Sequence, residues 1–130
     1  MPERSKDWFA QAQRDLKSAQ AQLKDEFFEW ACFISQQAAE KAVKAVFQKL
    51  GAEAWGHSVT ALLKGLGEKI AIPEQLINKA KKLDRFYIPA RYPNGWVSGT
   101  PAEYITREDA QDAISNSEKI LQFCEDFLVK

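Results

Sequence analysis

"FISQQAAEKAVKAVFQKLG", residues 33–51, decides the fold of this 130-residue chain. Its apolar side chains recur every three or four positions, which predicts a helix from about Glu26 to Leu50 that ends at Gly51. At about 100° per residue, the apolar positions spread over more than half of the helix circumference. One neighbouring helix cannot cover so wide an arc. The helix is therefore either the centre of a bundle or partly buried against a second copy of the chain.

Apolar periodicity of the same kind appears before this stretch. Ser5 is expected to cap a helix that extends to about Leu23. Its stripe consists of Trp8, Ala12, Leu16, Ala19 and Leu23. Such a stripe is typical of a helix that packs one face against a core.

Three further helices are predicted after the central one. Ser58 can cap a short helix that stops at Gly67, and Pro73 opens the next helix. Thr106 and Asp109 form a capping-box-like pair at the start of the last helix. The sequence therefore predicts an all-α fold, an antiparallel up-and-down bundle of about five helices, in a single domain over residues 1–130.

Composition restricts the class of protein. Eighteen basic and eighteen acidic residues leave no net charge, which argues against a bulk DNA binder. No apolar run approaches the roughly 18 residues of a membrane span, and we expect a cytoplasmic protein without membrane contact. Cys32 and Cys124 fall on apolar helix faces and are interpreted as reduced core residues.

The chain contains no HExxH, Cys-x-x-Cys, GxSxG, P-loop or GxGxxG motif. His57 is the only histidine, so sites that need two histidines are excluded, and neither a metal nor another cofactor is expected. We interpret His57 as a first-turn or capping residue of the helix that follows it. Its neighbour Trp55 is interpreted as packed on the core. No catalytic residue is assigned.

The segment from Arg85 to Ile105 has no helical period and is rich in proline and aromatic residues. So long an irregular loop is uncommon in a compact domain unless it is functional or disordered, and its prolines argue against disorder. We therefore predict a positively charged pocket that binds a nucleotide phosphate or an acidic partner, with Arg91 as its anchor. The other residues assigned to it are Tyr92 and Trp96 as stacking wall, Asn94 in the turn, and Lys82 and Arg85 as supporting charges. Alternatively, the aromatic residues pin the loop to the bundle and Arg91 pairs with a nearby carboxylate.

Five segments of the chain form a recognisable set. They are "WFAQAQRDLKSAQ" (residues 8–20), "FISQQAAEKAVKAVFQKLG" (residues 33–51), "HSVTALLKGL" (residues 57–66), "RYPNG" (residues 91–95) and "PAEYITREDAQDAI" (residues 101–114). Together, and in this order through nearly the whole chain, they resemble the HEPN domain family. "QQAAEKAVKA" together with "RYPNG" is the specific part of the resemblance.

The resemblance implies a helical bundle, commonly a homodimer, that is often encoded beside a minimal nucleotidyltransferase as a toxin-antitoxin-like pair. HEPN ribonucleases carry an arginine followed, after four to six residues, by a histidine. The corresponding positions after Arg91 are Trp96, Val97 and Ser98, so this motif is absent. Arg91 itself matches the loop arginine of the nucleotidyltransferase-associated branch.

Two functional hypotheses follow. The first is a non-catalytic HEPN protein that pairs with a nucleotidyltransferase and binds a nucleotide; an enzyme is the less favoured interpretation, and RNA the less favoured ligand. The second is a metal-independent ribonuclease toxin in which Arg91 works with an unusual base, such as Tyr92 or His57, brought in by folding or by a second subunit.

Overall fold

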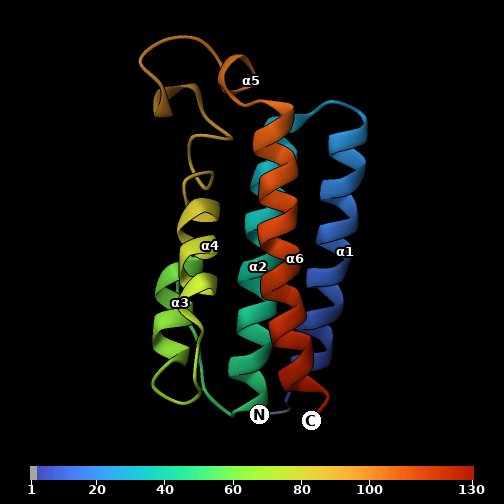
Figure 1. The fold of residues 1–130 in the computed structure, drawn as a ribbon, viewed down its shortest axis with the longest axis vertical. Helices are drawn as coiled ribbons and strands as arrows, with labels where there is room; N and C mark the ends of the chain where they lie inside the picture. Colours follow the sequence, from blue (N-terminus) through green and yellow to red (C-terminus); the bar gives the residue numbers. More distant parts are fainter. Residues whose placement is uncertain (1–2) are drawn as a thin grey trace.

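The computed structural model describes residues 3–130, which form helices and no strand. The elements are α1 (Ser5–Lys24), α2 (Phe28–Lys49), α3 (Val59–Leu66), α4 (Glu74–Asp84), the 3₁₀ turn η1 (Pro93–Gly95), α5 (Pro101–Tyr104) and α6 (Arg107–Leu128). The long helices alternate in direction along the chain, and the start of α1 lies at the same end of the bundle as the end of α6 (Figure 1). The predicted all-α, antiparallel fold is confirmed, with the four-residue α5 as an additional helix.

Helix α2 is the centre of the bundle. It packs against α1, α6, α3 and α4, and twelve of its 22 residues are buried. Alanines at positions such as Ala38, Ala42 and Ala45 are fully buried and allow the neighbouring helices to approach closely. The wide apolar arc of this helix is therefore covered within one chain, and a second copy is not needed to explain it.

The helix ends match the predictions at some positions and correct them at others. Ser5 does not cap α1, because Arg4 occupies the cap position and Ser5 is the first residue of the helix. The central helix begins at Phe28 rather than Glu26, since Glu26 has a φ of 67° and lies in the turn before it. Gly51 takes the expected left-handed conformation, with a φ of 72°.

Two predicted caps are confirmed. The hydroxyl of Ser58 accepts a hydrogen bond from the N–H of Ala61 at 3.1 Å. At the start of α6, the N–H of Asp109 donates to Thr106 Oγ1 at 3.1 Å, and the N–H of Thr106 donates to Asp109 Oδ2 at 2.9 Å. These contacts satisfy N–H groups that a helix cannot satisfy internally.

Both cysteines are buried and free, as predicted. Burial raises the pKa of the Cys32 thiol to about 12 and also raises the pKa of Cys124. The thiols are therefore protonated at neutral pH and behave as small apolar core residues.

The residues from 85 to 105 lie at one end of the bundle, beyond the end of α4 (Figure 1). They contain more local structure than a single irregular loop, because η1 and α5 divide them. Thr100 and Glu103 form a capping box at α5, in which the N–H of Thr100 donates to Glu103 Oε2 at 2.6 Å. The second half of this segment is thus tied by local hydrogen bonds that the sequence analysis did not predict.

Two kinds of feature are absent from the part of the chain that the structure describes. Between residues 3 and 130, no helix has the length and apolar character needed to cross a membrane. Within the same residues, no three side chains of His, Cys, Asp or Glu are grouped so that they could hold a metal ion.

Candidate functional site

Arg91 lies in a cage of three aromatic rings. Its guanidinium carbon is 4.5 Å from the centre of the Phe33 ring, 4.6 Å from that of Tyr87 and 5.0 Å from that of Tyr92. A cation over the face of an aromatic ring is attracted by the negative charge density there. The cage therefore holds the side chain of Arg91 without an ion pair.

A single hydrogen bond fixes the near end of the guanidinium group. Arg91 Nε donates to the backbone oxygen of Tyr87 at 2.7 Å. Within residues 3–130, the two terminal nitrogens of Arg91 have no hydrogen-bond partner, and the carboxylate partner considered in the sequence analysis is not found. The outer edge of the guanidinium group is thus available to a planar anion such as a carboxylate, or to two oxygens of a phosphate.

The backbone that carries Arg91 is a compact turn after α4. The N–H of Arg91 donates to the oxygen of Ile88 at 3.0 Å, and the N–H of Tyr92 donates to the same oxygen at 3.2 Å. Pro89, within this turn, has a restricted φ. Phe33 comes from α2 and packs against the core, so the cage is anchored to the centre of the bundle.

His57 lies next to the same cage. Its ring stacks on Tyr87, with ring centres 5.2 Å apart and an angle of 15° between the planes. Its Nδ1 is 3.2 Å from Oε2 of Glu40, a residue of α2 that is only 5% exposed. Lys44 Nζ donates to the same oxygen at 3.1 Å. The side chain of His57 does not cap α3, which corrects the interpretation drawn from its position before that helix.

The fold therefore brings Arg91 and His57 to one aromatic ring, that of Tyr87. The two residues are 34 positions apart, so a spacing rule for a local Arg–His motif cannot detect the pair. Sequence reasoning also missed Glu40. Helix α2 carries other charged side chains, such as Glu29, Lys41 and Lys44, so the sequence holds no signal that singles out Glu40.

Asp84 fixes the backbone next to His57. The carboxylate of Asp84 accepts hydrogen bonds from Ser58 Oγ at 3.0 Å and from the N–H groups of Val59 and Thr60 at 2.9 Å each. Gln36 Nε2 donates to Asp84 at 3.1 Å and to the backbone oxygen of His57 at 2.6 Å. Helices α2, α3 and α4 are joined at this polar junction.

The hydrogen bonds at the junction decide the charge of Asp84. Burial raises the pKa of this carboxyl group, but hydrogen bonds from Thr60, Gln36 and Val59 favour its charged form and outweigh burial. The net result is a pKa below the ordinary value. Asp84 is therefore ionised at neutral pH and caps the N-terminus of α3 with a full negative charge.

The other predicted site residues are distributed differently. Tyr92 contributes a ring to the Arg91 cage and is 48% exposed, and Asn94 is exposed in η1. Trp96 stacks on Tyr104, with ring centres 4.3 Å apart, and its Nε1 donates to the oxygen of Pro89 at 2.7 Å. Trp96 thus pins the loop, as the structural alternative predicted for the aromatic residues.

Lys82 on α4 and Arg85, which directly follows that helix, lie on the side that faces α6. They line a hollow of about 260 Å³ together with Asp109 and Asp112. Their charges face carboxylates there, and no contact between them and Arg91 is found in residues 3–130. Trp55 is 83% exposed, so the interpretation of this residue as packed on the core is wrong.

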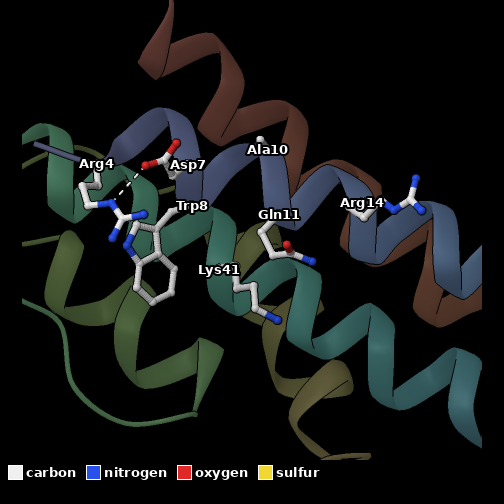
Figure 2. Close-up of a pocket in the computed structure, with 7 residues that line it drawn as sticks. All are labelled: Arg4, Asp7, Trp8, Ala10, Gln11, Arg14 and Lys41. Atoms are coloured by element: carbon white, nitrogen blue, oxygen red, sulfur yellow. Dashed lines mark hydrogen bonds and ion pairs between the residues drawn. The ribbon is translucent and has the colours of Figure 1, made fainter.

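A second hollow is an open groove of about 740 Å³ between α1 and α2. Figure 2 shows Arg4, Trp8, Gln11 and Lys41 along it. Two of its cations are already paired, because Arg4 contacts Asp7 at 2.9 Å and Lys41 contacts Asp15 at 2.5 Å. An anion in this groove would therefore have to compete with Asp7 and Asp15 for these two cations, whereas the terminal nitrogens of Arg91 have no partner among residues 3–130.

Comparison with known proteins gives consistent relatives. The HEPN domain model matches residues 5–127. The candidate toxin MJ1304 of Methanocaldococcus jannaschii is 29% identical over 133 residues, which cover 95% of this chain and 88% of the relative.

Three crystal structures are similar over nearly the whole chain. TT1696 from Thermus thermophilus has a TM-score of 0.93 and 43% identity, covering 96% of this chain and 98% of that one. The archaeal HEPN homologue ST0689 has a TM-score of 0.82 and 39% identity over the same shares. The HEPN domain protein tm0613 of Thermotoga maritima has a TM-score of 0.78 and 43% identity, covering 95% and 98%. The sequence match and the shared fold together establish that this chain belongs to the HEPN domain family.

Proposed function

We propose that the protein is a non-catalytic HEPN partner of a minimal nucleotidyltransferase, acts in the cytoplasm in a toxin-antitoxin-like pair, and binds a nucleotide through Arg91. One observation carries this proposal. The aromatic cage holds Arg91 in place while its two terminal nitrogens have no partner among residues 3–130. A guanidinium group that is fixed and unpaired is suited to a phosphate, because it forms two parallel charge-assisted hydrogen bonds without losing much side-chain freedom.

The surroundings of Arg91 support a nucleotide over a simple anion. The ring of Tyr92 is about half exposed beside the guanidinium group and offers a face on which a base can stack. The similarity to the candidate toxin MJ1304 supports a toxin-antitoxin-like setting. The partner enzyme is proposed from the resemblance of "RYPNG" (residues 91–95) to the nucleotidyltransferase-associated branch.

Calorimetry with ATP, GTP and the purified nucleotidyltransferase tests this function. Charge-assisted hydrogen bonds contribute roughly 1.5 to 3 kcal/mol, so Arg91→Ala should weaken binding about tenfold to a hundredfold. Arg14→Ala is the matched control, because Arg14 is an exposed arginine on α1 that lines the groove of Figure 2. Unchanged affinity in a folded Arg91→Ala variant would contradict the proposal.

A specific observation favours the metal-independent ribonuclease as a second candidate. His57 is held by Glu40 beside the ring on which Arg91 rests, so a histidine does accompany the arginine in space. RNA incubated with the protein in the presence of a chelator separates the two functions. Cleavage that disappears in both Arg91→Ala and His57→Ala would replace the binding function by catalysis, whereas we expect no cleavage above background.

A homodimer is part of the proposal. Large apolar side chains are exposed on and just before α2 and in the turn after α4: Phe27, Trp30 and Ile88. A twofold dimer would cover such side chains, and this symmetry is the commonest among soluble oligomers. Light scattering at micromolar concentration should give twice the chain mass of 14.8 kDa, and a value near the chain mass would exclude the dimer.

A further inference from the structure

We infer that His57, oriented by the buried Glu40, is a second phosphate contact of the site, and that the ligand is a nucleoside diphosphate or triphosphate rather than a monophosphate. The inference rests on the proposed function, since it assumes that one phosphate binds at Arg91. It assigns a ligand class and a binding role to His57, which the sequence analysis considered only as a possible catalytic base, and it adds Glu40 to the site.

The orientation of His57 follows from its contacts. Both carboxylate oxygens of Glu40 lie within 3.3 Å of Nδ1, so this nitrogen carries a proton and donates it to the carboxylate. The ring is also held flat against Tyr87. The side chain of His57 is nevertheless 59% exposed, and its other nitrogen, Nε2, has no partner in residues 3–130. The geometry thus fixes one nitrogen and leaves the other available to a ligand.

Tyr87 limits the distance between the two contacts. The guanidinium carbon of Arg91 lies 4.6 Å from the centre of the Tyr87 ring, and the imidazole centre of His57 lies 5.2 Å from the same point. Their separation therefore cannot exceed the sum of these two distances. A chain of two or three phosphates presents anionic oxygens over a comparable length, whereas a single phosphate at Arg91 leaves His57 without a partner.

The charges around His57 suit an anionic ligand. Glu40 and Lys44 lie beside it on α2, and Tyr87 and Arg91 on the turn after α4. An imidazole that carries both N–H groups can donate from Nδ1 to Glu40 and from Nε2 to a phosphate at the same time.

The test is calorimetry of the full chain with AMP, ADP and inorganic pyrophosphate in one buffer. The wild type should bind ADP at least about tenfold more tightly than AMP, which corresponds to one additional charge-assisted hydrogen bond. His57→Gln should remove this preference while it retains the affinity for AMP. Glu40→Gln should reduce the preference, because it removes the negative charge that orients the ring.

The outcomes separate the inference from the proposed function. Equal affinities of the wild type for ADP and AMP, or a preference for ADP that survives in His57→Gln, would overturn the inference. The proposed function would stand in that case if Arg91→Ala bound AMP more weakly than the wild type does. Absence of binding by all three ligands, or unchanged binding in Arg91→Ala, would overturn both. Circular dichroism confirms that each variant is folded, and His57→Gln decides the matter if Glu40→Gln is unstable.

Discussion

The two halves of the segment from residue 85 to residue 105 use aromatic side chains in opposite ways. In residues 93–105, Trp96 and Tyr104 stack on each other at 4.3 Å and close the loop on itself. In residues 85–92, the rings of Tyr87 and Tyr92 instead surround Arg91 and leave its outer edge open. The second half is held by its own aromatic pair, whereas the first half holds a cation against α2.

This difference shows why aromatic content alone does not identify a binding loop. Both halves contain tyrosine and proline. What differs is the partner of each ring, which in one half is another ring and in the other half is a guanidinium group. A ring that meets a ring contributes to stability, and a ring that meets an unpaired cation arranges that cation for a ligand.

The largest effect on stability is expected from Trp96→Ala. The substitution removes the stacked ring and the hydrogen bond to Pro89, and should cost about 2 to 3 kcal/mol, a little below the range for a fully buried aromatic residue. The melting temperature should fall by roughly 10 °C. Trp55→Ala is the matched control, because Trp55 is highly exposed and its removal should change little. Equal melting temperatures for the two variants would contradict the claim that Trp96 holds residues 93–105 in place.

Asp84→Asn tests the polar junction of α2, α3 and α4 that lies next to the first half, residues 85–92. The variant loses a charged acceptor of hydrogen bonds from Ser58, Val59 and Thr60, and should be less stable than the wild type by about 2 kcal/mol at pH 7. Thermal unfolding of the two proteins in the same buffer measures the difference.

The same substitution gives a pH dependence of known sign. The folded-state pKa of Asp84 lies below the ordinary value of 3.8, so its contribution to stability is present above that pH and is lost as the pH falls through the folded-state pKa. The difference in melting temperature between wild type and Asp84→Asn should therefore shrink below about pH 4. A difference that stays constant on acidification would exclude this role of the charge.

Arg91→Ala should have a small effect on stability. Cation–π contacts of a half-buried side chain are weak, and the one hydrogen bond of Arg91 is to a backbone oxygen, so we expect a loss of about 1 kcal/mol. Urea unfolding measures this directly. A loss as large as that of Trp96→Ala would show that the first half is a structural element like the second half and that Arg91 is not a binding residue.

The smallest effect is expected from Tyr104→Phe. The substitution keeps the ring that stacks on Trp96 and removes the hydroxyl that donates to the backbone oxygen of Ser98. The contact is exposed, so the loss should be about 0.5 kcal/mol, measured by urea unfolding. A loss above that of Asp84→Asn would show that the hydroxyl, not the stacked ring, closes the second half.

Several parts of the fold were predictable because they depend on residues that are close in sequence. The apolar period of α2, the left-handed conformation at Gly51, and the caps at Ser58 and Thr106 all arise within one or two helical turns. The choice between a central helix and a dimer interface for α2 was not predictable. It depends on how many helices of the chain surround α2, which the period of one helix does not contain.

The sequence by itself determined the helical bundle, the HEPN family and the presence of Arg91 as a cation in a rigid aromatic setting. Only the tertiary structure decided what surrounds that cation. Phe33 and Glu40 come from α2, and His57 from the turn before α3; α4 leads into the turn that carries Tyr87 and Arg91. These contacts join residues far apart in the chain, so their distances are set by the packing of whole helices and not by local spacing. For the same reason, the sequence does not distinguish the roles of Trp96 and Tyr92. In the structure Trp96 stacks on Tyr104, whereas the ring of Tyr92 contacts Arg91.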